Sequence, residues 1–147
     1  VWLGAAFAWA VPMAFAAQTG KVPPLAWLLL SAVVLWVLVY DTQYAMVDRD
    51  DDLALAMKTS AITLGRFDVI GVTLFYAAYL ASWSLLGRSL GLGWLFQLGI
   101  AAAAAQAAWH HALIRDRSRD GCFKAFRVNH WLGATVFAGV ALDLALR

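Results

Sequence analysis

The sequence predicts an all-α fold, a multi-pass bundle of transmembrane helices, and three observations support this. Hydrophobic residues make up 63% of the 147 positions, charged residues only 14%, and the mean hydropathy is +0.72. Soluble domains contain about 25% charged residues. The apolar residues also form long runs with almost no charge, whereas transmembrane strands alternate apolar and polar residues. The composition therefore excludes a disordered chain and points to a helical protein in a bilayer.

The apolar runs define the expected elements in order. A helix needs about 20 apolar residues to cross the hydrocarbon core of a bilayer. The first run is shorter and begins at once with valine rather than methionine, so we expect residue 1 to be a cut through a longer protein. The second run carries Asp41 near its end, the third and fourth carry no charge, and the fifth carries only Asp143. The five expected spans are 1–17, 25–47, 69–87, 92–114 and 128–146, and together they form one membrane domain over residues 1–147.

The connecting segments fall alternately on two sides of the expected membrane. The side with segments 18–24 and 88–91 carries three Lys or Arg residues when Arg147 is included, and the side with 48–68 and 115–127 carries eight. The positive-inside rule therefore places the second side in the cytoplasm. The short connections favour a bacterial plasma membrane over a mitochondrial inner membrane. A net charge of +2 is too small for a nucleic-acid surface, and the single cysteine excludes a disulfide framework.

Acidic residues gather at the end of the second span. All nine acids are aspartates, and five of them lie between positions 41 and 52. If the helix continues through this stretch, steps of three and four residues share a face. Asp41, Tyr44, Asp48 and Asp52 then form one stripe, with Asp51 beside it, while positions 49 and 50 turn away.

Such a stripe is unfavourable unless something compensates its charge. Like charges four residues apart repel each other, carboxylates oppose the helix dipole at a C-terminus, and an acid inside a span costs about 2.5–3.5 kcal/mol. A divalent cation would offset all three effects, and oxygen ligands select Mg²⁺ or Mn²⁺ over zinc. Because Mg²⁺ takes one or two carboxylates and completes its shell with phosphate oxygens, the pattern suggests a metal-bridged diphosphate at the cytoplasmic edge. The alternatives are a solvated acidic loop that caps the next helix and, for Asp41, pairing with a buried cation.

Two sequence blocks resemble a known family. Tyr40–Asp52, followed by Lys58-Thr59-Ser60-Ala61 and Leu64-Gly65, is similar to the second aspartate-rich motif of the UbiA superfamily of membrane prenyltransferases. Cys122–Phe126, followed by Asn129 and Trp131-x-Gly133, resembles the last cytoplasmic loop of the branch that acts on 4-hydroxybenzoate in ubiquinone biosynthesis. The resemblance runs along the whole chain, whereas the first aspartate motif of the family is absent.

The resemblance implies a fold and a reaction. The family bundle has nine transmembrane helices, of which this chain would supply the last five. The reaction transfers a polyprenyl group from polyprenyl diphosphate to the ring of 4-hydroxybenzoate and releases diphosphate, with Mg²⁺ between the diphosphate and two aspartate motifs. By position, Asp48 and Asp52 match the metal ligands of the second motif. Because the other motif is missing, we expect this 147-residue piece to be inactive alone.

The remaining site candidates surround these two aspartates. We expect Lys58 to stabilise the leaving diphosphate and Tyr44 to present its ring to an allylic cation or its hydroxyl to the diphosphate. Asp41, Asp51, Arg49 and Asn129 are the candidate substrate-binding residues.

Three other functions fit parts of the pattern. A prenyltransferase of the same superfamily with another acceptor is the nearest, followed by a subunit of a cation or proton transporter. The latter would place acids at mid-depth on several helices. A structural membrane subunit with an acidic docking loop is the third.

Overall fold

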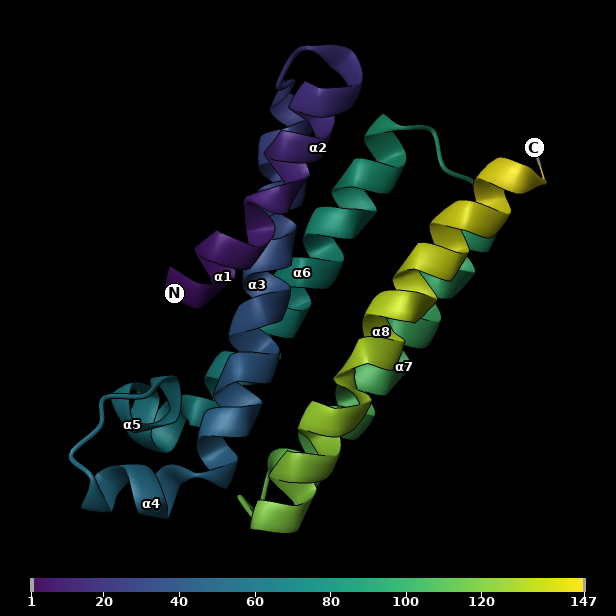
Figure 1. Cartoon of the computed structure of the whole chain (residues 1–147). Coiled ribbons are helices and arrows are strands. Elements are labelled where there is room, and N and C mark those ends of the chain that lie inside the picture. The colour runs from purple at the N-terminus through teal and green to yellow at the C-terminus, as the bar shows by residue number, and fades with distance from the viewer. Residues whose placement is uncertain (1, 147) are drawn as a thin grey trace.

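The computed structural model describes residues 2–146, and in that range the regular structure is entirely helical (Figure 1). This confirms the all-α part of the expected fold class. Val1, the first residue of the first expected span, and Arg147, counted among the charges, lie outside the described residues. The elements are α1 (Trp2–Ala8), α2 (Ala10–Thr19), α3 (Pro24–Val47), α4 (Arg49–Ala54), α5 (Ser60–Leu64), η1 (Gly65–Phe67), α6 (Asp68–Ser89), α7 (Trp94–Ile114) and α8 (Arg119–Ala145).

The first apolar run is helical but interrupted at Trp9, between α1 and α2. Pro12 explains the interruption, because it lacks the N–H that would bond to the Ala8 carbonyl and its ring crowds that carbonyl. α2 then ends at Gly20, whose φ of 67° is the left-handed conformation that glycine adopts most easily. The chain turns there and returns as α3.

The long helices alternate in direction as the sequence predicts. In Figure 1 the α2–α3 and α6–α7 connections lie at one end of the bundle, and α4, α5 and the α7–α8 connection lie at the other. The expected loop over 115–127 is wrong in part, since α8 already begins at Arg119. Its first turns bury Cys122, Ala125 and Asn129, and this spacing of three and four residues gives them one inward face.

Two segments of the described chain are long and apolar enough to cross a membrane by length and composition. They are Pro24–Val47, with a mean hydropathy of 2.0 over its most apolar window, and Ser60–Ser89, with 1.7. They correspond to the second and third expected spans. Five spans in this chain, and nine in the whole protein, remain predictions.

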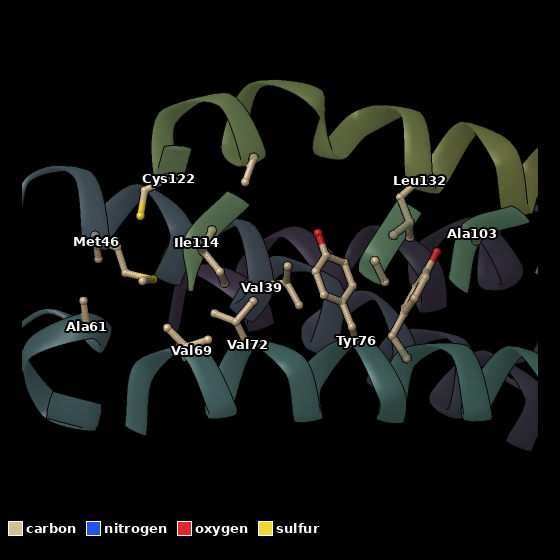
Figure 2. Packing of buried hydrophobic residues seen from close by; sticks show 14 of the residues in the cluster. Val39, Met46, Ala61, Val69, Val72, Tyr76, Ala103, Ile114, Cys122 and Leu132 are labelled. Atoms are coloured by element: carbon tan, nitrogen blue, oxygen red, sulfur yellow. The ribbon is translucent and has the colours of Figure 1, made fainter. Parts of the chain in front are cut away.

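A buried hydrophobic core joins the helices next to the end of the bundle that carries α4 and α5. Figure 2 shows Met46 of α3 close to Ala61 of α5, with Val69 and Val72 of α6 in the same layer. On the other side of the bundle, α7 and α8 pack so closely that a Cβ added to Gly99 would lie 2.9 Å from the Cα of Gly139. Small residues allow this approach of two backbones. The α7–α8 pair is therefore a closely fitted unit, and α3 and α6 lie against it.

Candidate functional site

A cavity of about 760 Å³ is lined by residues of α3, α4, α5, α6 and the segment that joins α4 to α5. Five of the eight candidate site residues of the sequence line it. These residues are Asp41, Tyr44, Asp48, Asp52 and Lys58. Their positions span 18 residues of sequence and four local structures: α3, the junction at Asp48, α4 and the segment that joins α4 to α5. The apolar side chains of Leu38, Met57 and Phe75 complete part of the wall.

The helix does not continue straight through the aspartates, so the expectation of one continuous stripe is wrong. α3 ends at Val47, and α4 begins at Arg49 and leads sideways away from the end of α3 in Figure 1. The amide of Asp52 still donates to the carbonyl of Asp48, at 2.8 Å. The break has an electrostatic reason. In a separate helix, acids at positions 50–52 occupy the first turn, where the helix dipole favours negative charge, instead of extending an unfavourable C-terminus.

The two proposed metal ligands come from either side of this break. Asp48 is half-buried at the junction, whereas Asp52 is only 8% exposed although it carries a carboxylate. Within residues 2–146, Asp52 and Lys58 form no ion pair, and Asp48 has only a long contact of 3.6 Å with Arg119. A nearly buried carboxylate without a cationic partner is costly unless a ligand compensates it.

Three candidate residues lie away from the cavity wall. Arg49 donates to the buried carboxylate of Asp68, with 2.9 Å between Nη1 and Oδ2. Asp51 accepts from Arg119 at 3.1 Å on the outer side of α4. The substrate-binding roles of Arg49, Asp51 and Asn129 stay predictions.

Asn129 belongs to a buried polar network between four helices. Its Oδ1 accepts from Trp36 Nε1 at 2.8 Å, and its Nδ2 donates to Gln43 Oε1 at 3.1 Å. Gln43 in turn donates to the hydroxyl of Tyr76, which lies 2.6 Å from Nδ1 of His110. Polar groups in an apolar span need such partners. The polar residues Gln43, His110 and Asn129, which stand within otherwise apolar runs of the sequence, could therefore have indicated this network.

A second polar cluster, which the sequence reasoning missed, is centred on Asp68. This carboxylate is fully buried at the start of α6 and forms ion pairs with Arg49 and with Arg117, the latter at 2.7 Å. Arg117 also donates to the carbonyl of Arg66. Its φ of 58° is unusual for a residue with a side chain. Asp68 therefore ties three segments together, namely the start of α4, the start of α6 and the α7–α8 connection.

Two ionisable groups near this end have perturbed pKa values. Burial of the Cys122 thiol raises its pKa from 9.0 to about 11, so the sulfur is inert at neutral pH. Hydrogen bonds from the backbone N–H and the hydroxyl of Ser118 lower the pKa of the exposed Asp116 carboxyl. Neither group lines the cavity.

The donor set of the cavity suits Mg²⁺ in one respect and is incomplete in another. Carboxylate oxygens of Asp48 and Asp52 are hard ligands, of the kind that Mg²⁺ prefers. No group of three or more His, Cys, Asp or Glu side chains that could hold a metal ion is found among residues 2–146. These two aspartates can therefore contribute to a magnesium site only together with oxygen atoms from elsewhere, such as the phosphates of a substrate.

Known proteins have similar sequences over nearly the whole chain. Three of the similar relatives are each named 4-hydroxybenzoate octaprenyltransferase. The one from Methylibium petroleiphilum is 57% identical over 99% of this chain and 51% of its own length. The one from Cupriavidus necator is 60% identical over 99% and 51%, and the one from a Polaromonas species is 59% identical over 96% and 49%. The chain thus spans about half the length of the curated relatives it matches.

The family comparison agrees with this similarity. No solved structure matches the chain. Residues 1–133 match the model of the UbiA prenyltransferase family, which is nine-tenths of the chain. Together with identities of 55–60% to several relatives, this match establishes the family. The chain belongs to the UbiA prenyltransferase family.

Proposed function

We propose that the complete protein containing this chain transfers a polyprenyl group from polyprenyl diphosphate to the ring of 4-hydroxybenzoate and releases diphosphate. The observation that supports this most directly is the single cavity lined by Asp41, Tyr44, Asp48, Asp52 and Lys58. Its carboxylates and ammonium suit a metal-bound diphosphate, and its apolar wall suits an isoprenoid. The names of the relatives supply the acceptor.

The side chains of the proposed site have different roles. Asp48 and Asp52 would supply carboxylate oxygens to Mg²⁺, which when bound neutralises the negative charge that builds on the departing diphosphate. Lys58 adds a fixed cation near the same oxygens. The carbon–oxygen bond of the prenyl diphosphate breaks, and a ring carbon of the acceptor forms a bond to the allylic carbon and then loses its proton. Tyr44 offers its ring face to the positive charge that develops on the allylic group.

The proposal includes a location and a helix count. The two apolar segments and the bacterial relatives favour the inner membrane, and the excess of basic residues supports a cytoplasmic position for the aspartate end of the bundle. Five spans from this chain would belong to a nine-helix bundle. The insoluble prenyl tail would then remain in the lipid while its diphosphate reaches the water-exposed end.

The test uses the full-length protein reconstituted in lipid nanodiscs, with labelled 4-hydroxybenzoate, a polyprenyl diphosphate and Mg²⁺. We expect Asp48→Asn and Asp52→Asn each to reduce transfer by at least about 100-fold, because each removes a charged ligand. Asp50→Asn is the matched control, since Asp50 is an exposed neighbour that does not line the cavity. Undiminished transfer by both variants would refute the proposed site. Transfer to a naphthoate or to homogentisate but not to 4-hydroxybenzoate would instead show that the acceptor is wrong.

A further inference from the structure

Buried hydroxyl groups without partners gather at the cavity. Within residues 2–146, four buried side-chain polar atoms have no hydrogen-bond partner, and three of them are the hydroxyl oxygens of Thr42, Thr59 and Ser60. All three residues line the 760 Å³ cavity. Buried polar groups are nearly always hydrogen-bonded, so such a concentration at one place requires an explanation.

Thr42 departs from the pattern of the other hydroxyls in this chain. A helical Ser or Thr ordinarily satisfies its hydroxyl by donating to the carbonyl four residues earlier. Seven residues in the described chain do this, namely Thr19, Ser31, Thr63, Thr73, Ser82, Ser84 and Thr135. Thr42 lies inside α3, is 0% exposed and has no such bond. Its hydroxyl therefore remains available to a group in the cavity.

We propose that the hydroxyls of Thr42, Thr59 and Ser60, with the ammonium of Lys58, form a subsite for the anionic oxygens of a substrate. The hydroxyls can donate hydrogen bonds, and the ammonium supplies positive charge without an ion-pair partner among residues 2–146. Phosphate and carboxylate oxygens share the chemistry that these donors recognise. This inference rests on the proposed function, which supplies both groups: the diphosphate of the prenyl donor and the carboxylate of the aromatic acceptor.

The position of the subsite relative to the aspartates supports this assignment. Asp41, Asp48 and Asp52 line the same cavity, and their negative charges would repel an anion that approached them without a metal ion. The hydroxyls and Lys58 provide the donors on this wall that need no metal. They would bind anionic oxygens that lie beyond the reach of the metal ion, and so fix the orientation of the substrate.

The test compares Thr42→Val, Thr59→Val and Ser60→Ala in the full-length protein. Thr63→Val is the matched control, because the Thr63 hydroxyl is already donated to the Thr59 carbonyl at 2.8 Å. Two measurements are made. The first is the KM for each substrate, and the second is direct calorimetric binding of 4-hydroxybenzoate and of magnesium pyrophosphate, which does not depend on turnover. Loss of a hydrogen bond to a charged group should weaken binding by about 10- to 100-fold.

Each outcome has a defined meaning. A higher KM and weaker binding for 4-hydroxybenzoate alone would assign the subsite to the carboxylate. The same changes for the prenyl diphosphate and pyrophosphate alone would assign it to the phosphate, and either result supports the proposal. Affinities within twofold of wild type for all three variants would overturn it, since the hydroxyls would then hold only water.

Two further observations keep the test decisive. Thermal unfolding should show Thr42→Val as stable as wild type or more stable, because an apolar isostere replaces a buried unpaired hydroxyl. Weaker binding by a protein of undiminished stability separates a binding role from a folding defect. If the wild-type protein transferred no prenyl group to 4-hydroxybenzoate, the proposed function would fail, whereas the calorimetric data on the hydroxyl variants would still decide the subsite.

Discussion

Replacing Asp68 by asparagine should loosen the end of the bundle that holds the cavity. The substitution keeps the shape of the side chain and an oxygen that can accept from the amide of Val69, which lies 2.7 Å away in the wild type. It removes the negative charge shared by Arg49, at 2.9 Å, and Arg117, at 2.7 Å. Two guanidinium groups would then face each other without the anion between them.

The size of the effect follows from burial. Removing one partner of a fully buried ion pair costs about 3–5 kcal/mol. Here the carboxylate is 0% exposed, but the side chains of Arg49 and Arg117 are 31% and 40% exposed, so water partly solvates them after the change. We therefore expect a loss of about 2–3 kcal/mol in the free energy of unfolding. A loss of 1 kcal/mol lowers the melting temperature of a chain of 150–250 residues by about 2–4 °C and that of a longer chain by less. For a full-length protein about twice as long as this chain, the decrease should be at least about 3 °C.

Two assays on the full-length protein in detergent would check this expectation. Thermal unfolding gives the change in melting temperature, with Asp120→Asn, an exposed acid on α8, as a control that should change the stability by less than about 0.5 kcal/mol. Hydrogen exchange measured without metal should show faster exchange in residues 49–57, while the core of α7 and α8 stays protected. The reasoning is refuted if Asp68→Asn matches wild type in both assays, because the ion pairs would then contribute nothing to the placement of α4.

Two other changes test different parts of the fold. The peptide containing Cys122 should react with iodoacetamide at pH 8 at least about 100-fold more slowly than in the denatured protein, because raising the thiol pKa from 9.0 to about 11 reduces the thiolate fraction by that factor. For the same reason, the thiol's contribution to stability is fully present below pH 9 and is lost as the pH rises toward 11; fast alkylation of the native protein would contradict the burial of the sulfur. Gly99→Ala should destabilise the protein by about 1–3 kcal/mol, since the new Cβ would lie 2.9 Å from the Cα of Gly139. Ala101→Ser, at an exposed position of the same helix, is the control, and a melting temperature for Gly99→Ala equal to that of the control would show that α7 and α8 can separate easily.

The helices that the sequence predicted well are those whose existence depends only on local composition. The expected spans 25–47, 69–87 and 92–114 differ from α3, α6 and α7 by two residues or fewer at each end. The interruptions were harder to predict because each depends on a competing local effect. Pro12 breaks the first run at Trp9, and repulsion among the aspartates is relieved by a new helix after Asp48.

The candidate site shows the same division between local and distant determinants. Asp48 and Asp52 do line one cavity, although a kinked chain brings them there and the predicted straight stripe does not. Spacing alone could not identify Asp68, because its importance depends on Arg117, which lies 49 residues further along the chain. The unpaired state of Thr42 is likewise visible only in three dimensions, since its neighbours Asp41 and Gln43 do not reveal that its hydroxyl makes no bond to the carbonyl four residues earlier.

The contact between Gly99 and Gly139 limits how such a protein can be redesigned. Where these two backbones touch, a side chain is crowded at either glycine, so substitutions at Gly99 and Gly139 are penalised regardless of their chemistry. The cavity, by contrast, is lined by no described residue of α7 or α8, and part of its wall is built from the short elements α4 and α5 and from the segment between them, where Leu55 and Met57 are 71% and 50% exposed. A mutant library intended to admit a bulkier substrate should therefore vary residues 55–57 and 61–64, keep the proposed binding residues 58–60, and leave the glycine seam unchanged.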